Sequence, residues 1–464
     1  MTQVGVLNRK AERGDDVASI QEMVLYGVKG CCAYAEHAHM LGKEKDEVYG
    51  AIHSILDELT NPKPTVDSLL ALAMKTGATN LSVMQMLDEG HTQRFGRSLR
   101  WMGFECDQSF VHQSSGDPAP NKVSCTPVVG KCLLVSGHDL ADLEEILKQT
   151  EGTGVNVYTH GEMLPAHGYP GLRKYKHLVG HYGGAWQLQR MEFGNFPGAI
   201  VMTSNCIIEP RRSYKDRIFT RQMVGWPGVF HLEGNNFKAA IDASLQADGF
   251  TEEDAKTRPS FVTTGFGRNT VMSVAGVVVD LVKSQKISHF YVIGGCDGSE
   301  GERNYFRELA LSTPNDSVIL TLGCGKYRFN RAELGNLPGT ELPRVLDMGQ
   351  CNDAYGAIVV ASALAKAFNT TVPNLPLSFA VSWFEQKAVA VLLTLLHLGI
   401  KNIRLGPNLP GFVTPNVLNV LVGKIRMIVH CHFFAHRCFC VSDKFQIKKI
   451  GDVQGDLKMM AANK

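Results

Sequence analysis

The stretch KCLLVSGHDLADLEEILKQTEGTGVNVYTHGE, residues 131–162, decides the fold class of this chain. Its first part, CLLVSG, predicts a buried strand, and Asp139 is a suitable N-cap for the helix that follows. One face of that helix is apolar, formed by Leu140, Leu143 and Leu147. We expect the helix to end at Gly152, and VNVYTHG then predicts a second strand. A strand, a helix and a second strand in this order form a parallel βαβ unit.

The same alternation continues toward the C-terminus. Further strands are predicted at 199–205 (AIVMTSN), 261–267 (FVTTGFG), 289–295 (HFYVIGG), 317–323 (SVILTLG), 344–349 (RVLDMG), 377–383 (LSFAVSW) and 402–406 (NIRLG). Helices are predicted at 237–245, 277–282 and 355–368 and in the apolar run 388–400. Strands that alternate with helices indicate parallel sheets, and these are enough for two α/β domains.

The first hundred residues follow a different pattern. Apolar residues recur at helical spacing from Ile20 to Leu87, with Pro62 and Pro64 between two of the helices. We therefore predict an α/β protein with an α-helical N-terminal portion. Its domains are the remainder of a helical bundle at 1–125 and two Rossmann-like parallel-sheet α/β domains at 126–267 and 268–464.

Composition narrows the class of protein. The chain has 464 residues, 44% of them apolar and 20% charged, which is typical of a soluble globular protein with several domains. A net charge of +2 disfavours a nucleic-acid binder. The apolar run 388–400 is shorter than the roughly 20 residues that span a bilayer, and the N-terminus does not resemble a signal peptide. We expect a cytoplasmic protein, or one of an organellar matrix if a targeting segment is missing from this chain, with no nucleic-acid or membrane partner.

Chemically active side chains follow the predicted strands at the same topological position. They are His138, Glu162, Cys206, Cys296, Cys324, Cys351, Glu385 and Lys387. In open α/β sheets, ligands bind outside the carboxyl ends of the strands. A single cysteine there is more often a small buried hydrophobic residue, and a single glutamate or histidine more often serves a helix start or a turn. Their recurrence at successive strand ends, flanked by glycine, favours a shared site.

The ligand types indicate which metal would bind. Four thiolates select a soft metal, namely iron in an iron–sulfur cluster, zinc or copper(I). The twelve cysteines include no CxxC pair, which disfavours a zinc ribbon. An ordinary iron–sulfur cube takes four cysteines, so two carboxylates and an imidazole are in excess. The combination predicts a multi-iron cluster with sulfur-bridged irons and harder, oxygen-ligated irons that leave positions for a small substrate.

Several long motifs resemble the hybrid-cluster protein family, also called prismane proteins or hydroxylamine reductases. They are SGHDL, GTGVNVYTHGEMLPAHGYP, GAIVMTSNCII, IGGCDG, GCGKYRFN, GQCNDAY and SWFEQKA, within residues 23–410. The resemblance implies a prismane-like fold and a hybrid iron–sulfur–oxygen cluster of the 4Fe-2O-2S type. Its implied ligands are His138, Glu162, Cys206, Cys296, Cys324, Cys351 and Glu385. It also implies catalytic roles for Cys296, which matches a persulfide-carrying cysteine, for Glu385, and for Lys387 beside the cluster.

This sequence departs from the family pattern in three places. The family's first helical segment carries the cysteines of a second iron–sulfur cluster and has no counterpart here, so we expect no second cluster. Cys31 and Cys32 cannot replace it, because adjacent helix residues point about 100° apart. Residues 97–115 and 423–443 match no family pattern, and we interpret both as non-native inserts. The alternative for the second, a zinc site among its histidines and cysteines, has no standard finger spacing.

The resemblance implies an oxidoreductase that reduces hydroxylamine to ammonia and water. Reduction of nitric oxide to nitrous oxide and a peroxidase side activity are further implied activities. The partners would be a small nitrogen-oxide substrate and an electron donor such as ferredoxin or an NADH-dependent reductase. One alternative is a nitric-oxide sensor or protein nitrosylase that does not turn over. Another is a carbon monoxide dehydrogenase-like enzyme, which the glutamate and histidine ligands disfavour.

Overall fold

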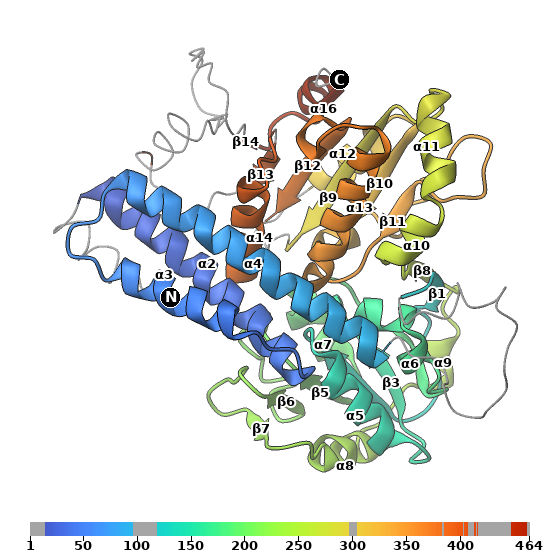
Figure 1. Ribbon diagram of the computed structural model, residues 1–464. Helices are drawn as coiled ribbons and strands as arrows, with labels where there is room; N and C mark the ends of the chain where they lie inside the picture. The colour runs from blue at the N-terminus through green and yellow to red at the C-terminus, as the bar shows by residue number, and fades with distance from the viewer. Residues whose placement is uncertain are drawn as a thin grey trace, which may run out of the picture.

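In the computed structural model, a layer of long helices lies against two α/β units (Figure 1). The structure describes residues 14–95, 118–296, 304–382, 385–401, 403–406, 413, 415 and 447–461, with the backbone alone for 447–449. Both predicted inserts, 97–115 and 423–443, lie outside these residues. None of the described helices has the length and apolarity needed to cross a membrane.

The first α/β unit is built on a six-stranded parallel sheet. Its strands in spatial order are β4 (Leu178–His181), β3 (Asn156–Thr159), β2 (Cys132–Ser136), β5 (Ala199–Met202), β6 (Ile218–Arg221) and β7 (Phe230–Leu232). The strand order reverses between β2 and β5. Such a reversal opens a crevice at the carboxyl ends of the two central strands, where ligands bind in doubly wound folds.

The second unit repeats this topology in another six-stranded parallel sheet. Its strands in spatial order are β11 (Val345–Asp347), β10 (Ser317–Thr321), β9 (His289–Gly295), β12 (Leu377–Ser382), β13 (Ile403–Gly406) and β14 (Ile447–Lys449). Here the order reverses between β9 and β12. The two Rossmann-like parallel sheets expected from the sequence are therefore confirmed, and each has one reversal point.

Helices cover both faces of each sheet, because successive strand residues point to opposite sides. In the first unit, α5 (Leu140–Thr150) and α8 (Lys238–Gln246) pack on one face and α7 (Gln189–Asn195) on the other. In the second, α11 (Ala275–Lys283) and α13 (Ala354–Ala367) cover one face, and α12 (Tyr305–Ser312) and α16 (Val453–Ala461) the other. The predicted cap is present: the Asp139 carboxylate accepts hydrogen bonds from the first turn of α5.

The helical layer consists of α2 (Asp15–Met40), α3 (Asp46–Leu59) and α4 (Val66–Phe95), which are drawn in blue in Figure 1. A helix from the second unit, α14 (Gln386–His397), packs against α2 and α4. Glycines allow the close approach, since an added Cβ at Gly27 would lie 2.6 Å from the Leu393 side chain. The Thr394 hydroxyl donates to the Gly77 carbonyl oxygen at 3.0 Å. The apolar run near the C-terminus thus completes the N-terminal helical layer.

The structure corrects some details of the predicted elements. The strand predicted at 261–267 forms as β8 (Phe261–Thr264), but it pairs antiparallel with β1 (Asn121–Ser124) in a separate two-stranded sheet. The strands β1, β4, β6, β7 and β14 were not predicted, because their three or four residues are not part of a longer apolar run. The domain boundary at 267–268 falls between β8 and α10 (Arg268–Ser273) and stays a prediction.

Replacing Gly77 with alanine should destabilise the protein by about 1–3 kcal/mol. The new Cβ would lie 2.6 Å from the Leu393 carbonyl carbon, so α14 must move away from α4. Gly50 in α3 is the matched control, because an added Cβ there meets nothing within 4 Å. Gly50→Ala should instead stabilise by about 0.5–1 kcal/mol through helix propensity. Denaturant unfolding gives the free energy of unfolding of both variants. Equal changes in Gly77→Ala and Gly50→Ala would contradict the close packing of α14 against α4.

Candidate metal centre

The predicted site residues of the first unit follow neighbouring strands. His138 lies just after β2, Glu162 just after β3 and Cys206 after β5, so the set flanks the reversal point. His138 and Glu162 are buried. Cys206 itself has a left-handed backbone with φ of 75°, which is rare for a residue other than glycine. Such strain is usually kept where a side chain must point in one direction.

The second unit supplies its residues from equivalent places. Cys296 follows β9, Cys324 follows β10, Cys351 follows β11, and Glu385 lies after β12 as the N-cap of α14. A glycine with positive φ directly precedes several site residues of the two units, namely Gly137, Gly161, Gly295 and Gly323. These glycines turn the chain sharply at the strand end, where a larger residue would be strained. The sharp turn keeps the next side chain at the edge of the sheet.

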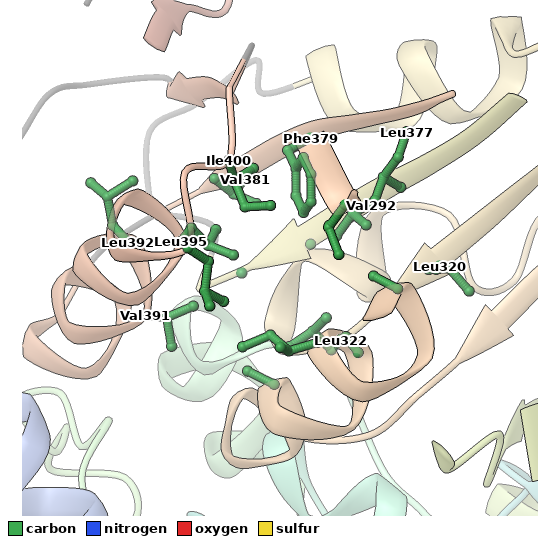
Figure 2. A pocket seen from close by; sticks show the side chains of 18 of the residues that line it. Val292, Leu320, Leu322, Leu377, Phe379, Val381, Val391, Leu392, Leu395 and Ile400 are labelled. Carbon is green, nitrogen blue, oxygen red and sulfur yellow. The ribbon is translucent and has the colours of Figure 1, made fainter. Parts of the chain in front are cut away.

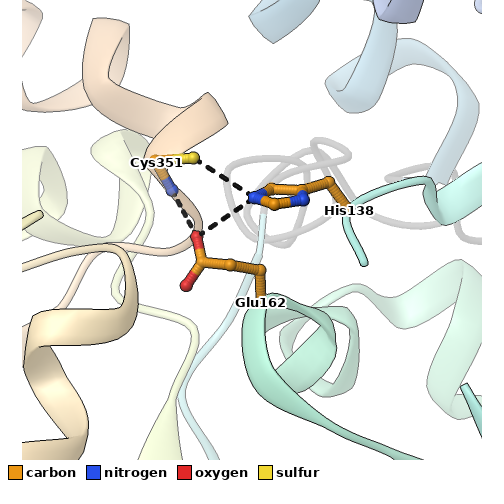
Figure 3. Close-up of side chains that lie close together, drawn as sticks. All are labelled: His138, Glu162 and Cys351. Carbon is orange, nitrogen blue, oxygen red and sulfur yellow. Dashed lines mark hydrogen bonds and ion pairs between the residues drawn. The ribbon is translucent and has the colours of Figure 1, made fainter. Parts of the chain in front are cut away.

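Three of the predicted ligands lie in direct proximity and come from both units. The ligand atoms of His138, Glu162 and Cys351 all lie within 4.8 Å of one another. Cys351 Sγ is 3.4 Å from His138 Nε2, and that nitrogen is 3.8 Å from Glu162 Oε2. The Cys351 backbone N–H donates to Glu162 Oε2 at 2.7 Å (Figure 3). The carboxyl edges of the two sheets therefore meet at this point.

The remaining site residues surround the same space. Burial raises the pKa of the Cys206, Cys296 and Cys324 thiols well above its usual value. Glu385 raises the thiol pKa further at Cys206 and Cys296, and Glu162 does so at Cys324. Cys296 lines the same cavity as Cys351, and Cys206 and Cys324 pack around Trp186, whose indole donates to the Cys296 carbonyl oxygen. Among the described residues, the structure brings the ligand atoms of His138, Glu162 and Cys351 within 4.8 Å of one another and places the other candidates around them.

Burial also sets the charge of His138. Loss of hydration lowers its pKa well below the usual value, and the nearby Lys387 and His37 lower it further. The imidazole is therefore neutral, which is the form that binds a metal. The His138 backbone N–H donates to the Ser204 hydroxyl at 2.8 Å, and the same hydroxyl lies 3.2 Å from His138 Nδ1. This second contact leaves Nε2 directed toward Cys351.

Two buried lysines offset part of the negative charge. Lys387 is fully buried, and its ammonium donates to the Asn352 side-chain oxygen at 3.2 Å. Burial by itself lowers the Lys387 pKa, but the neighbouring Cys351 and Glu385 outweigh that effect and raise it. Lys326 pairs with Asp347 and also donates to the Gly349 carbonyl oxygen at 2.7 Å. The sequence indicated Lys387, whereas Lys326 went unnoticed among the residues after Cys324.

Sequence reasoning also missed the residues that support the site. Asn352 is fully buried and links Lys387 to His37 of α2 through a contact of 3.3 Å. The Trp186 indole donates to the Cys296 carbonyl oxygen at 2.9 Å. Asn352 had a signal, since it follows Cys351 in the polar GQCND motif. His37 had none, because a helical pattern does not tell which residue faces another domain.

The donor set fits a metal cluster. The described cysteines are all free thiols, so none is committed to a disulfide. Glu162 Oε1 and both carboxylate oxygens of Glu385 are buried and lack a hydrogen bond of ordinary geometry. Unpaired buried carboxylate oxygens are costly unless a cation satisfies them. Thiolate, imidazole and carboxylate groups together suit iron with mixed sulfur and oxygen coordination.

An apolar cavity of about 280 Å³ reaches two of the candidate ligands. Cys296 and Cys351 form part of its wall, and the rest is mostly aliphatic. Figure 2 shows labelled lining residues from β9, β10, β12 and α14, including Val292, Leu320, Phe379 and Leu395. A small uncharged molecule in this cavity would be in contact with the candidate centre.

The fold and site define a class: a helical layer followed by two doubly wound α/β units whose strand ends meet at a candidate metal centre. The model of the Prismane/CO dehydrogenase family matches residues 1–436. The chain belongs to this family.

Similar proteins agree with that assignment. A hydroxylamine reductase of Yersinia pseudotuberculosis serotype O:3 (strain YPIII) is 50% identical over 426 residues, which are 92% of this chain and 73% of that protein. A hydroxylamine reductase of Burkholderia ambifaria (strain MC40-6) is 50% identical over 451 residues, 97% of this chain and 73% of that protein.

Solved structures are similar in fold. Carbon monoxide dehydrogenase IV from Carboxydothermus hydrogenoformans matches with a TM-score of 0.69 and 14% identity, over 97% of this chain and 88% of that chain. A nickel-free carbon monoxide dehydrogenase from Thermococcus sp. AM4 matches with a TM-score of 0.67 and 14% identity, over 97% of this chain and 85% of that chain. At this identity the likeness concerns the fold.

Replacing Cys324 with serine should remove most of the iron from anaerobically purified protein. A serine oxygen is a harder and less acidic ligand than a thiolate, so it binds iron of a sulfur cluster poorly. Cys31→Ser is the matched control, because Cys31 is equally buried but its thiol donates to the Thr76 carbonyl oxygen within the helical layer. The number of iron atoms bound per chain is measured for both variants. Full iron in Cys324→Ser would exclude Cys324 as a ligand.

Proposed function

We propose that this chain is a reductase of hydroxylamine and that its candidate metal centre holds a hybrid iron–sulfur–oxygen cluster. The observation that carries the proposal is the convergence of His138, Glu162 and Cys351, from two sheets, with ligand atoms within 4.8 Å. The 50% identity to curated hydroxylamine reductases supports the substrate. Cys206, Cys296, Cys324 and Glu385 complete the proposed ligand set.

The proposed reaction takes two electrons and two protons per hydroxylamine. The N–O bond breaks, nitrogen leaves as ammonia and oxygen as water. When bound, the cluster supplies electrons and an iron that polarises the substrate as a Lewis acid. The electrons come from a separate donor, for which ferredoxin or an NADH-dependent reductase is our proposal, and we propose the cytoplasm as the location.

Residues beside the cluster handle the protons. Lys387 has a raised pKa and lies fully buried, so it keeps a proton close to the ligands. Burial also raises the pKa of the Glu385 carboxyl, so this group takes up a proton more readily than an exposed glutamate when it is not bound to metal. We assign proton donation to Lys387 and Glu385, and we count Cys296 as the third catalytic residue because it lies at both the cavity wall and the ligand set. The hydrophobic wall keeps bulk water from the site.

Replacing Glu385 with glutamine should lower turnover by about 10²–10⁴-fold, the usual contribution of a general acid. All four thiolates remain, so the variant should keep most of its iron. Glu144→Gln is the control, because Glu144 is also mostly buried but pairs with Arg94 of α4 instead of a site residue. Hydroxylamine reduction with a reduced viologen dye gives the rates. An unchanged rate with intact iron would assign Glu385 a structural role only.

Nitric oxide is the second candidate substrate, and the apolar cavity favours it. Two nitric oxide molecules, two electrons and two protons give one nitrous oxide and one water. An uncharged, weakly polar diatomic molecule enters an aliphatic cavity without a large loss of hydration energy. Steady-state turnover distinguishes this enzyme from a nitric-oxide sensor or nitrosylase, which would bind without net reduction. Peroxide reduction is tested with the same reduced viologen dye, with hydrogen peroxide as the substrate.

Narrowing the cavity should test this second activity. Ala361 on α13 lines the cavity, and phenylalanine there would fill part of the 280 Å³ space. We expect Ala361→Phe to slow nitric oxide reduction more than hydroxylamine reduction, since hydroxylamine is the more strongly hydrated molecule and gains less from an aliphatic cavity. Ala367→Phe, at an exposed position of the same helix, is the control. Equal rates in wild type and Ala361→Phe would show that the cavity carries no substrate.

A further inference from the structure

The Gln350 side chain joins the two α/β units at the site. It precedes Cys351 of the second unit and is 1% exposed. Its amide nitrogen Nε2 donates to the His138 carbonyl oxygen at 3.0 Å and to the Glu162 carbonyl oxygen at 2.6 Å. A primary amide has two N–H groups, so each has one acceptor. Both acceptors belong to proposed ligands of the first unit.

The backbone around Gln350 is itself held firmly. Its N–H donates to Asp353 Oδ2 at 2.7 Å, which fixes the start of the turn Cys351–Asp353. The next N–H, of Cys351, donates to Glu162 Oε2 at 2.7 Å. One short turn of the second unit thus makes three hydrogen bonds to His138 and Glu162. Moving the turn would break all of them together.

The chemistry of glutamine suits this place better than that of similar residues. Glutamate has the same length but would direct a carboxylate oxygen at two carbonyl oxygens. Methionine has a similar length and no donor. Asparagine is one methylene shorter and could not reach both carbonyl groups from the same turn. Two donors at this length are what the two carbonyl groups require.

We propose that Gln350 is a positioning residue that sets the distance between Cys351 and the ligands His138 and Glu162. It acts through these ligands and has no bond to the metal. The inference rests on the proposed metal centre, because it assumes that all three residues bind one cluster. Groups that orient metal ligands in this way typically change metal affinity by about 10–100-fold when they are replaced.

The test compares two variants, Gln350→Met and Gln350→Glu, with Gln21→Met as the matched control. Gln21 is also 1% exposed, and its amide donates to the Leu59 carbonyl oxygen at 3.4 Å in the helical layer. It lies sixteen residues before His37 on α2, or about 24 Å along the helix. Each protein is purified anaerobically, and iron retention against a chelator, the electron paramagnetic resonance spectrum and the unfolding temperature without metal are measured.

We expect both Gln350 variants to lose iron at about 10–100-fold lower chelator concentration than wild type and to show an altered cluster spectrum. Gln21→Met should lower the unfolding temperature and leave spectrum and iron retention unchanged. A purely structural role for Gln350 would lower only the unfolding temperature, and this outcome would overturn the proposal. So would wild-type spectra in both Gln350 variants.

The result separates this inference from the proposed function. Wild-type protein that holds iron but does not reduce hydroxylamine would refute the proposed reaction, while the spectra of the Gln350 variants would still decide the positioning role. Wild-type protein that takes up no iron under anaerobic reconstitution would overturn both, because there would be no centre to position.

Discussion

Burying several acidic side chains at one place is the constraint on which the rest of this structure depends. Thiols and carboxylates removed from water resist ionisation, and burial raises the pKa of Cys351 and Glu385 accordingly. They can ionise together, as metal ligands must, only if positive charge compensates them. Lys387 and Lys326 supply part of that charge within the chain, and a cationic cluster would supply the remainder. The sheets and the helical layer hold these charges in a fixed arrangement.

The two sheets solve this problem with matched topology. His138 after β2 corresponds to Cys296 after β9, and Glu162 after β3 corresponds to Cys324 after β10. On that side of the reversal point, the first sheet offers nitrogen and oxygen and the second offers sulfur. Across the reversal point the types are exchanged, with Cys206 after β5 and Glu385 after β12. Each unit thus contributes both soft and hard groups, and the seven proposed ligands are complete only when the two units meet.

The sequence placed the candidate ligands at strand ends because each of them follows a strand whose apolar run is easy to identify. A glycine before His138 or Cys296 marks the strand end, and parallel strands bring such ends to one edge. Contacts between the helical layer and the α/β units could not be predicted in this way. Nothing in the helical pattern of α2 indicates that His37 faces Asn352, and nothing in α14 indicates that it packs between α2 and α4. The antiparallel pairing of β8 with β1 also depends on a partner far away in the sequence.

The cavity and the charged ligands together restrict the substrates of the proposed enzyme. A nitrogen oxide that reaches Cys296 through the aliphatic cavity must give up its hydration before it meets any compensating charge. Nitrate or nitrite would lose the hydration energy of a full charge, which apolar walls cannot replace. Neutral hydroxylamine and nitric oxide lose far less. Cys351 lines the cavity, and the buried Lys387 beside it bonds to Asn352 and holds a proton that a substrate gaining electrons could accept. A substrate that enters uncharged and is protonated only inside the site is therefore favoured. This selects small neutral nitrogen compounds over anions such as nitrate and nitrite.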